Sequence, residues 1–280
     1  MARSRTVPLV GLFESSVPEP RVLLRKAVSA TIEPEFGQFY ASAFGGGNPY
    51  VIELIANSFK VSIEHVICTT GATGGLALLY RAFGRPGDHV LVETPGFDLF
   101  HDLADDRGLA IDTFQRRGAG YSIDPGEVEA KIRPDTRLIV LSNLHNPSGM
   151  ALDYEVLGKL ATIAERHGTL LVVDEVYGDF AGAEARPCPA AALSPAVVSV
   201  SSLTKIFGLA TLRCGWIVGA PAVMKIVRDA STRLEFGVSN LAHAVAAQIL
   251  SNPAPFSDYT GAILAQARPV VEKWVAAMTA

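Results

Sequence analysis

The chain has 280 residues, of which 49% are hydrophobic and 19% are charged, and its formal net charge is −4. This balance is typical of a well-packed globular protein and excludes an intrinsically disordered chain. The sequence also lacks the basic stripe that nucleic-acid-binding proteins present to phosphate backbones, so we expect no nucleic-acid partner.

The cysteines and the length of the apolar runs indicate where in the cell the protein is expected. The chain has three cysteines, Cys68, Cys188 and Cys214, in a spacing that fits a reducing compartment and no metal site. The apolar stretch at 7–13 is short and contains a proline, so it does not predict a signal peptide. No apolar run reaches the length of a membrane span. We therefore expect a soluble, cytoplasmic protein with no membrane partner.

The predicted elements alternate along most of the chain. Residues 1–20 contain three prolines and little periodicity, which indicates an extended arm, and an amphipathic helical pattern begins at Pro49. The predicted strands are 65–69, 89–93, 110–114, 138–142, 169–173, 196–200 and 214–218. The predicted helices include 75–83, 97–107, 125–132, 154–167 and 221–233.

This order predicts an α/β fold. Nearly continuous apolar runs, such as those at 138–141 and 170–173, indicate strands that are covered on both faces. Alternating strands and helices predict a three-layer α/β/α domain around a mostly parallel sheet of roughly seven strands. Such sheets bind ligands beyond the carboxyl ends of their strands, so the residues that follow each strand are the candidates for a site.

A glycine-rich turn follows the first predicted strand. It reads Thr70-Gly71-Ala72-Thr73-Gly74 and runs into a helical pattern. Free N–H groups at a helix start suit a phosphate, although glycines also serve ordinary tight turns. The turn is also similar to the nucleotide turn of short-chain dehydrogenases. However, Ala77 occupies the place of the last glycine and no Tyr-x-x-x-Lys pair follows, which excludes that class.

The next three strand ends carry an aromatic ring, an amide and a carboxylate. Phe97 follows the second strand and either packs in the core or stacks on a flat ligand. Asn146 lies in an Asn-Pro-Ser-Gly turn, which it either caps or uses to present an amide to a ligand. Asp174 follows four apolar residues, so its carboxylate needs a cationic partner, either a basic side chain or a ligand nitrogen. Tyr177 lies within reach of the same place.

The last strand end carries a lysine. Lys205 ends the hydroxyl-rich turn 201–205, and Arg213 follows eight residues later. This lysine is either a surface residue or an amine nucleophile beside an anion site, with a pKa lowered by desolvation or by a nearby cation. Taken together, the five strand ends offer phosphate donors, an aromatic face, an amide, a carboxylate with a tyrosine, and a lysine. Pyridoxal 5′-phosphate needs all of these groups, so we expect it as the cofactor.

The order and spacing of these motifs resemble one enzyme family. They are Gly71-Ala72-Thr73, Pro95-Gly96-Phe97, His145-Asn146-Pro147-Ser148-Gly149, Asp174-Glu175-Val176-Tyr177 and Ser202-Leu203-Thr204-Lys205 with Arg213. From about Tyr40 to about Ala247 the chain resembles fold-type I pyridoxal-phosphate enzymes of the class I/II aminotransferase family. The resemblance implies the PLP-dependent transferase fold and a homodimer. It also implies transfer of an amino group between an amino acid and a 2-oxo acid, in a biosynthetic role.

The resemblance also assigns roles to residues. Lys205 would form the internal aldimine and move the Cα proton, and Asp174 would pair with the protonated ring nitrogen. Tyr177 and Asn146 would hydrogen-bond the phenolic oxygen, and Phe97 would stack on the ring. The phosphate would be held by Gly71, Ala72, Thr73, Ser202, Thr204 and Arg213. Tyr40 would reach the phosphate of the partner subunit, with a half-buried structural tyrosine as the alternative.

The chain departs from the family after Lys205. The family carries a C-terminal small domain with an arginine that binds the substrate carboxylate, and none of Arg213, Arg228, Arg233 and Arg268 matches it. We therefore expect an N-terminal segment at 1–35, a large cofactor-binding domain at 36–255, and the start of an incomplete small domain at 256–280. A lyase, decarboxylase or racemase of the same fold, or a catalytically impaired cofactor-binding protein, stays open as an alternative.

Overall fold

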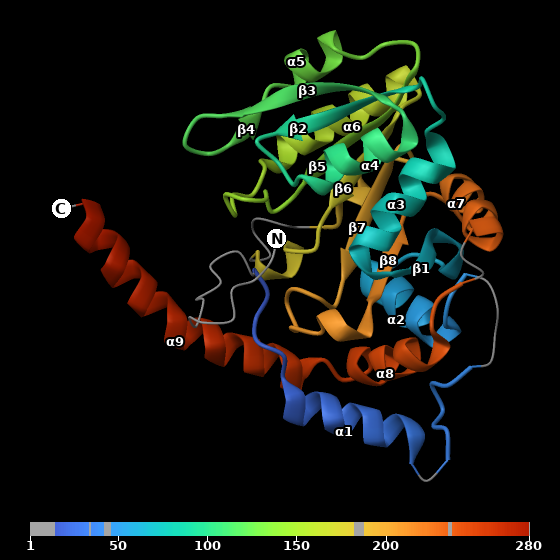
Figure 1. The fold of residues 1–280 in the computed structure, drawn as a ribbon, viewed down its shortest axis with the longest axis vertical. Coiled ribbons are helices and arrows are strands. Elements are labelled where there is room, and N and C mark those ends of the chain that lie inside the picture. The colour runs from blue at the N-terminus through green and yellow to red at the C-terminus, as the bar shows by residue number, and fades with distance from the viewer. Residues whose placement is uncertain (1–14, 34, 42–45, 182–187, 235–236, 280) are drawn as a thin grey trace, which may run out of the picture.

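The computed structural model of the protein describes residues 15–33, 35–41, 46–181, 188–234 and 237–279. A central sheet is covered by helices on both faces (Figure 1). The three-layer α/β/α prediction is confirmed.

The sheet of the described residues has eight strands in the order β1-β8-β7-β6-β5-β2-β3-β4. The strands from β7 to β3 in that order run parallel, whereas β8 is antiparallel to β1 and β7, and β4 is antiparallel to β3. Their bounds are β1 Val66–Thr70, β2 His89–Thr94, β3 Ala110–Arg117, β4 Ser122–Ile123, β5 Thr136–Ser142, β6 Leu170–Asp174, β7 Val197–Ser202 and β8 Cys214–Val218. The seven predicted strands are confirmed. The expectation of roughly seven strands missed β4, because two residues are too few to show an alternating pattern.

Helices fill the outer layers. On one face, α3 (Gly71–Phe83), α4 (Leu99–Arg107) and α7 (Pro221–Leu234) pack on residues such as Val92 and Val140. On the other face, α5 (Pro125–Ala130) and α6 (Tyr154–His167) cover the strands around β5. At the β1–β8 end of that face, α2 (Pro49–Phe59) and α8 (Asn240–Leu250) form a second apolar cluster.

Local sequence explains why some helix bounds were predictable. The helix α6 has the predicted bounds, because Asp153 caps its N-terminus by accepting from the Glu155 N–H, and Gly168 ends it in a left-handed conformation. The helix α3 begins at Gly71, four residues earlier than predicted, so its first turn is the glycine-rich segment itself. This places helix N–H groups directly after β1.

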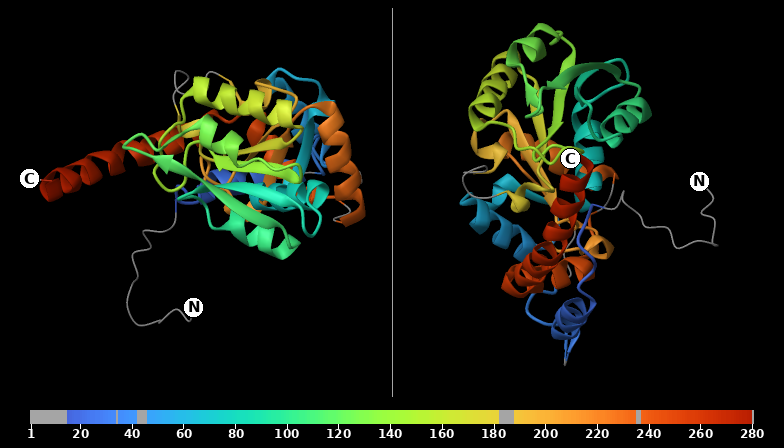
Figure 2. Two further views of the ribbon diagram at one scale, coloured as in Figure 1. Left: turned by 90° about the horizontal axis from the view of Figure 1, so that it is seen from above. Right: turned by 90° about the vertical axis from the view of Figure 1, so that its left-hand side faces the viewer.

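Each of the two terminal segments contains a long helix. The helix α1 (Arg21–Ile32) lies inside the segment 1–35, and only residues 15–20 of the predicted arm are described, without regular secondary structure. The helix α9 (Ala254–Thr279) runs through Pro269 and projects from the body of the protein (Figure 2). Its last turns expose Val270, Val271, Trp274 and Met278. None of the described helices combines the length and apolar character that a membrane crossing requires.

Candidate active site

A cavity of about 450 Å³ opens at the carboxyl ends of the parallel strands. Its wall contains the five residues that the sequence placed around a flat ring: Phe97, Asn146, Asp174, Tyr177 and Lys205. A smaller cavity of about 270 Å³ adjoins it, sharing Ser15, Asn146 and Tyr177 and adding apolar walls such as Phe180. Residues from four different strand ends therefore meet in one place.

Asp174 is the last residue of β6 and is only 4% exposed. Its Oδ1 accepts a hydrogen bond from the Val176 N–H at 3.0 Å. Burial raises the pKa of its carboxyl from 3.8 to about 7, and the charges of Glu93 and Glu175 add to that rise, whereas Lys205 opposes it. The charge of Lys205 does not offset the effect of burial, so the Asp174 carboxyl lacks a cationic partner strong enough to keep it ionised near neutral pH. A protonated ring nitrogen in the cavity would supply one.

Lys205 is half-buried in the turn after β7. Its Nζ donates to Ser15 Oγ at 3.0 Å and lies 5.4 Å from the centre of the Tyr177 ring. The Tyr177 hydroxyl is 2.5 Å from the same Ser15 Oγ. Within the described ranges, no carboxylate lies within ion-pair distance of Nζ. Among the described side chains, the amine thus contacts one hydroxyl and one aromatic ring.

Ser15 is a site residue that sequence reasoning missed. Its hydroxyl bridges Lys205 and Tyr177 across more than 150 residues of chain. It lies in a stretch without helical or strand periodicity, so no local signal distinguished it from its neighbours.

An anion cradle lies at the start of α3. Arg213 Nη2 donates to Thr73 Oγ1 at 2.8 Å and to the Thr70 carbonyl at 3.2 Å. The side chain of Thr70, the residue before the helix, makes no capping hydrogen bond. Gly71 has a φ of +71°, and a Cβ there would lie 2.6 Å from Arg213 Nη2. The glycine therefore leaves room for the guanidinium beside open helix N–H groups, which fits a phosphate dianion.

The remaining predicted phosphate ligands surround this cradle less directly. Ala72 is nearly buried in the first turn of α3. The Thr204 N–H donates to Ser202 Oγ at 3.3 Å, in the turn that leads to Lys205. Tyr40 is half-buried and its ring stacks on Phe36 at 4.3 Å. Tyr40 does not line the cavity, and its role toward a partner subunit stays a prediction.

The arginines after Lys205 other than Arg213 have structural partners or lie on the surface. Arg228 donates to the backbone carbonyls of Glu64 and Val66, and Arg233 donates to the Asp229 carbonyl. Arg268 is exposed on α9. None of these three lines the cavity at the strand ends, as expected from their mismatch with a substrate-carboxylate clamp.

Comparison with known proteins shows what this arrangement belongs to. The chain is 27% identical over 234 residues to the probable aspartate/prephenate aminotransferase of Thermus aquaticus, which covers 81% of this chain and 60% of that protein. It is 27% identical over 219 residues to an aspartate aminotransferase of Sulfurisphaera tokodaii, covering 75% of this chain and 55% of that protein. The chain thus spans little more than half the length of these curated relatives.

A solved structure and a family profile agree with these relatives. A single mutant of the Thermus thermophilus aspartate aminotransferase superposes with a TM-score of 0.83 at 23% identity, over 95% of this chain and 72% of the other. At that identity the likeness shows the fold. The profile described as Aminotransferase class I and II matches residues 19–275. The chain therefore belongs to the class I and II aminotransferase family.

Proposed function

We propose that the protein is a pyridoxal-phosphate-dependent aminotransferase that moves an amino group between an amino acid and a 2-oxo acid. The observation that carries this proposal is the single cavity in which Lys205, Asp174, Tyr177, Asn146 and Phe97 meet. Membership in the family supports the cofactor, and the names of the relatives support amino transfer.

The residues present fit the cofactor group by group. Arg213, Thr73 and the N–H groups of the first turn of α3 would hold its phosphate, with Gly71, Ala72, Ser202 and Thr204 around them. The buried carboxyl of Asp174 would face its ring nitrogen, and Lys205 would hold it covalently. When bound, pyridoxal phosphate supplies an electron sink that makes the Cα proton of an amino acid acidic.

The side chains of the cavity then divide the remaining work. With the cofactor bound, the amine of Lys205 would take the proton from the substrate Cα and return it at the cofactor carbon, as a positioned general base and acid. The hydroxyls of Tyr177 and Ser15 lie beside this amine and orient it. Asp174, ionised opposite a cationic nitrogen, keeps that nitrogen protonated. Tyr177 and the Asn146 amide would hydrogen-bond the phenolic oxygen, and Phe97 would cover one face of the ring.

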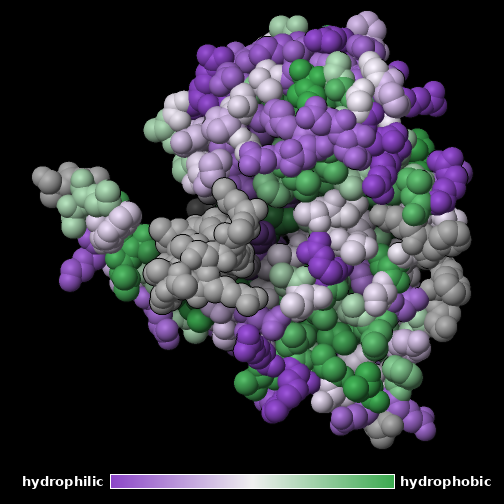
Figure 3. Space-filling view, in the orientation of Figure 1, coloured by the Kyte–Doolittle hydropathy of each residue, from purple (hydrophilic) through white to green (hydrophobic). Residues whose placement is uncertain are grey.

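We also propose a homodimer that acts in biosynthesis in the cytoplasm, with a large domain at 36–255 between the segments 1–35 and 256–280. Hydrophobic side chains gather on the lower half of one face, over the region of α2 and α8 (Figure 3). Large apolar residues such as Val22, Phe36 and Leu241 are exposed on the described surface. Exposed apolar surface of this kind supports association with a second copy, which would also bring Tyr40 to the partner's phosphate.

The half-reaction tests the proposed function. The cofactor-loaded protein is mixed with single amino acids without an acceptor, and the cofactor absorption and released products are measured. We expect conversion to the pyridoxamine form, with one 2-oxo acid released per site. Ammonia release would identify a lyase, and a bound cofactor that reacts with none of the amino acids would identify a cofactor-binding protein without transferase activity.

Replacing Arg213 with lysine is expected to weaken cofactor binding by roughly 10- to 100-fold. A lysine cannot reproduce the planar set of donors, and a lost hydrogen bond to a charged group costs about 1.5–3 kcal/mol. Titration of the cofactor-free protein with pyridoxal phosphate measures the dissociation constant. Arg233→Lys, which alters an arginine on a helix face, serves as the matched control. An Arg213→Lys variant that binds as tightly as the wild type would remove Arg213 from the phosphate site.

A further inference from the structure

A buried ion pair lies directly behind the active-site turn that carries Asn146. Arg116 Nε donates to Glu93 Oε2 at 2.7 Å, its Nη2 lies at ion-pair distance from the same oxygen, also 2.7 Å, and neither side chain has any exposed surface. Glu93 comes from β2 and Arg116 from β3, which are neighbours in the sheet. This pair was not among the residues predicted from the sequence, although Glu93 follows an apolar run just as Asp174 does.

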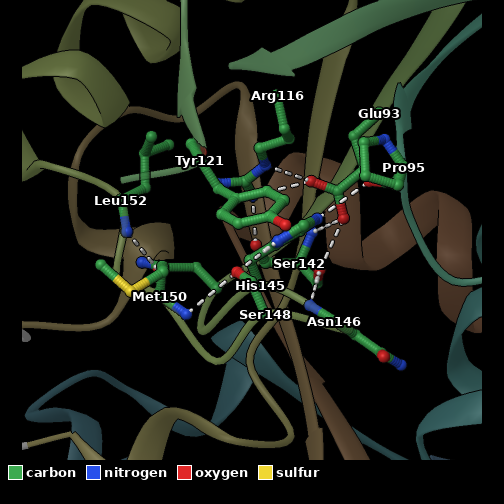
Figure 4. A network of polar contacts seen from close by, with 11 residues as sticks. Glu93, Pro95, Arg116, Tyr121, Ser142, His145, Asn146, Ser148, Met150 and Leu152 are labelled. Atoms are coloured by element: carbon green, nitrogen blue, oxygen red, sulfur yellow. Dashed lines mark hydrogen bonds and ion pairs between the residues drawn. The ribbon is translucent and has the colours of Figure 1, made fainter. Parts of the chain in front are cut away.

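The ion pair hydrogen-bonds the polar groups of Ser142, a residue of the strand on the other side of β2. Ser142 ends β5, the other neighbour of β2, and its N–H and Oγ lie 2.8 Å and 2.5 Å from Glu93 Oε1. Arg116 Nη2 donates to the Ser142 carbonyl at 2.5 Å. The N–H of Asn146 in turn donates to Ser142 Oγ at 2.9 Å. Figure 4 shows this chain of contacts, with the amide of Asn146 projecting away from it.

His145 braces the same turn from its other side. Its ring nitrogens lie 2.9 Å from the Pro95 carbonyl and 2.7 Å from Ser148 Oγ. Burial lowers the pKa of His145, so the ring is neutral and donates to the carbonyl from Nε2 while Nδ1 accepts from the serine. Its ring lies against Tyr121, whose carbonyl accepts from Arg116 Nη1 at 3.2 Å. The Asn146 turn and the turn before Phe97 are therefore tied together.

Stability alone does not explain an ion pair at this place. A buried pair contributes little net stability compared with apolar residues of similar volume. The same face of the sheet is filled by Leu91 and Phe114, two positions earlier on the same two strands, and an apolar pair could continue that layer. What the ion pair does that an apolar pair could not do is fix the position of Ser142. The Ser142 hydroxyl in turn fixes the backbone of Asn146.

We infer that Glu93 and Arg116 are positioning residues: through Ser142 they fix the turn that carries Asn146, and so set the direction in which its amide donates to the cofactor's phenolic oxygen. The inference rests on the proposed function, because that oxygen belongs to the bound cofactor. An amide that donates to the oxygen draws off negative charge and favours loss of the neighbouring proton. A loosened Asn146 therefore raises the pH midpoint of the cofactor's absorption change.

Two variants test the inference with two measurements. Ser142→Ala cuts the link but keeps the ion pair, and Glu93→Leu/Arg116→Met removes the pair without changing the net charge. We expect both to increase deuterium uptake of the segment 142–150 in the cofactor-free protein. We expect both to raise the pH midpoint of the bound cofactor, as Asn146→Ala does, with no further rise when Ser142→Ala is combined with Asn146→Ala. Thermal unfolding is recorded for each variant.

Ser199→Ala is the matched control. Ser199 is also a buried strand serine, and its Oγ accepts the Ala191 N–H at 3.0 Å outside the cavity. It should leave the midpoint unchanged. If Ser142→Ala lowers the melting temperature but changes neither the deuterium uptake of the segment 142–150 nor the pH midpoint of the cofactor absorption, the ion pair is structural and the inference is wrong. A wild-type protein that gains no absorption with pyridoxal phosphate overturns the proposed function and the inference together, whereas a normal wild type with an unmoved Ser142→Ala overturns the inference alone.

Discussion

Replacing Lys205 with alanine is expected to lower amino transfer by at least about 10⁴-fold, because one side chain supplies both the covalent link to the cofactor and the proton transfer at Cα. The amine lies in the cavity beside Ser15 and Tyr177. Steady-state rates with an amino acid and a 2-oxo acid measure the loss. The absorption of the lysine-bound cofactor should vanish at the same time.

Lys225→Ala is the control for this variant. Lys225 pairs with Asp229 at 2.9 Å on the exposed side of α7 and has no contact with the cavity. Its removal should leave rates within about twofold of the wild type, because an exposed helix pair contributes little. Retention of turnover by Lys205→Ala at a similar level would show that another amine does the chemistry.

The site was predictable where it depends on strand ends. A parallel sheet brings the ends of strands together whatever lies between them, so residues such as Asp174 and Asn146 could be grouped from their place after apolar runs. Each of them carried an alternative, structural interpretation when taken alone. The combination of five ends pointed to a single ligand, and the family profile confirms the class of protein.

The parts that sequence reasoning missed depend on contacts between distant segments. Ser15 contacts Lys205 although 190 residues separate them, because the start of the described segment 15–20 lies at the cavity wall. Ser142 lies 49 residues from Glu93, and its three bonds to the ion pair follow from strand order. No local sequence pattern predicts the order of the strands in the sheet. The helix α1 was missed for a different reason, since it directly follows Pro20 and no side chain caps its start.

A second large effect is expected at Asp174, where Asp174→Asn should lower transfer by about 10²- to 10³-fold while stabilising the cofactor-free protein. The activity falls because a neutral amide cannot hold the ring nitrogen protonated. The stability rises because the folded protein keeps a proton on Asp174 up to a pKa of about 7, whereas an unfolded chain releases it near 3.8. The stability of the wild type therefore falls as the pH rises through that window, by roughly 4 kcal/mol in total.

Asparagine is uncharged at every pH, so the stability of the Asp174→Asn variant does not fall as the pH rises through this window. Its melting temperature without cofactor should exceed that of the wild type at pH 8, and the difference should disappear only as the pH falls below 3.8, where Asp174 is protonated in both the folded and the unfolded chain. Asp153→Asn is the control, because asparagine caps α6 as well as aspartate does and the residue lies outside the cavity. A variant at Asp174 that is less stable than the wild type at pH 8 would mean that the carboxylate already has a cationic partner in the empty site. In that case it would not depend on a ring nitrogen for its charge, and its role would be to build the strand end rather than to tune the cofactor.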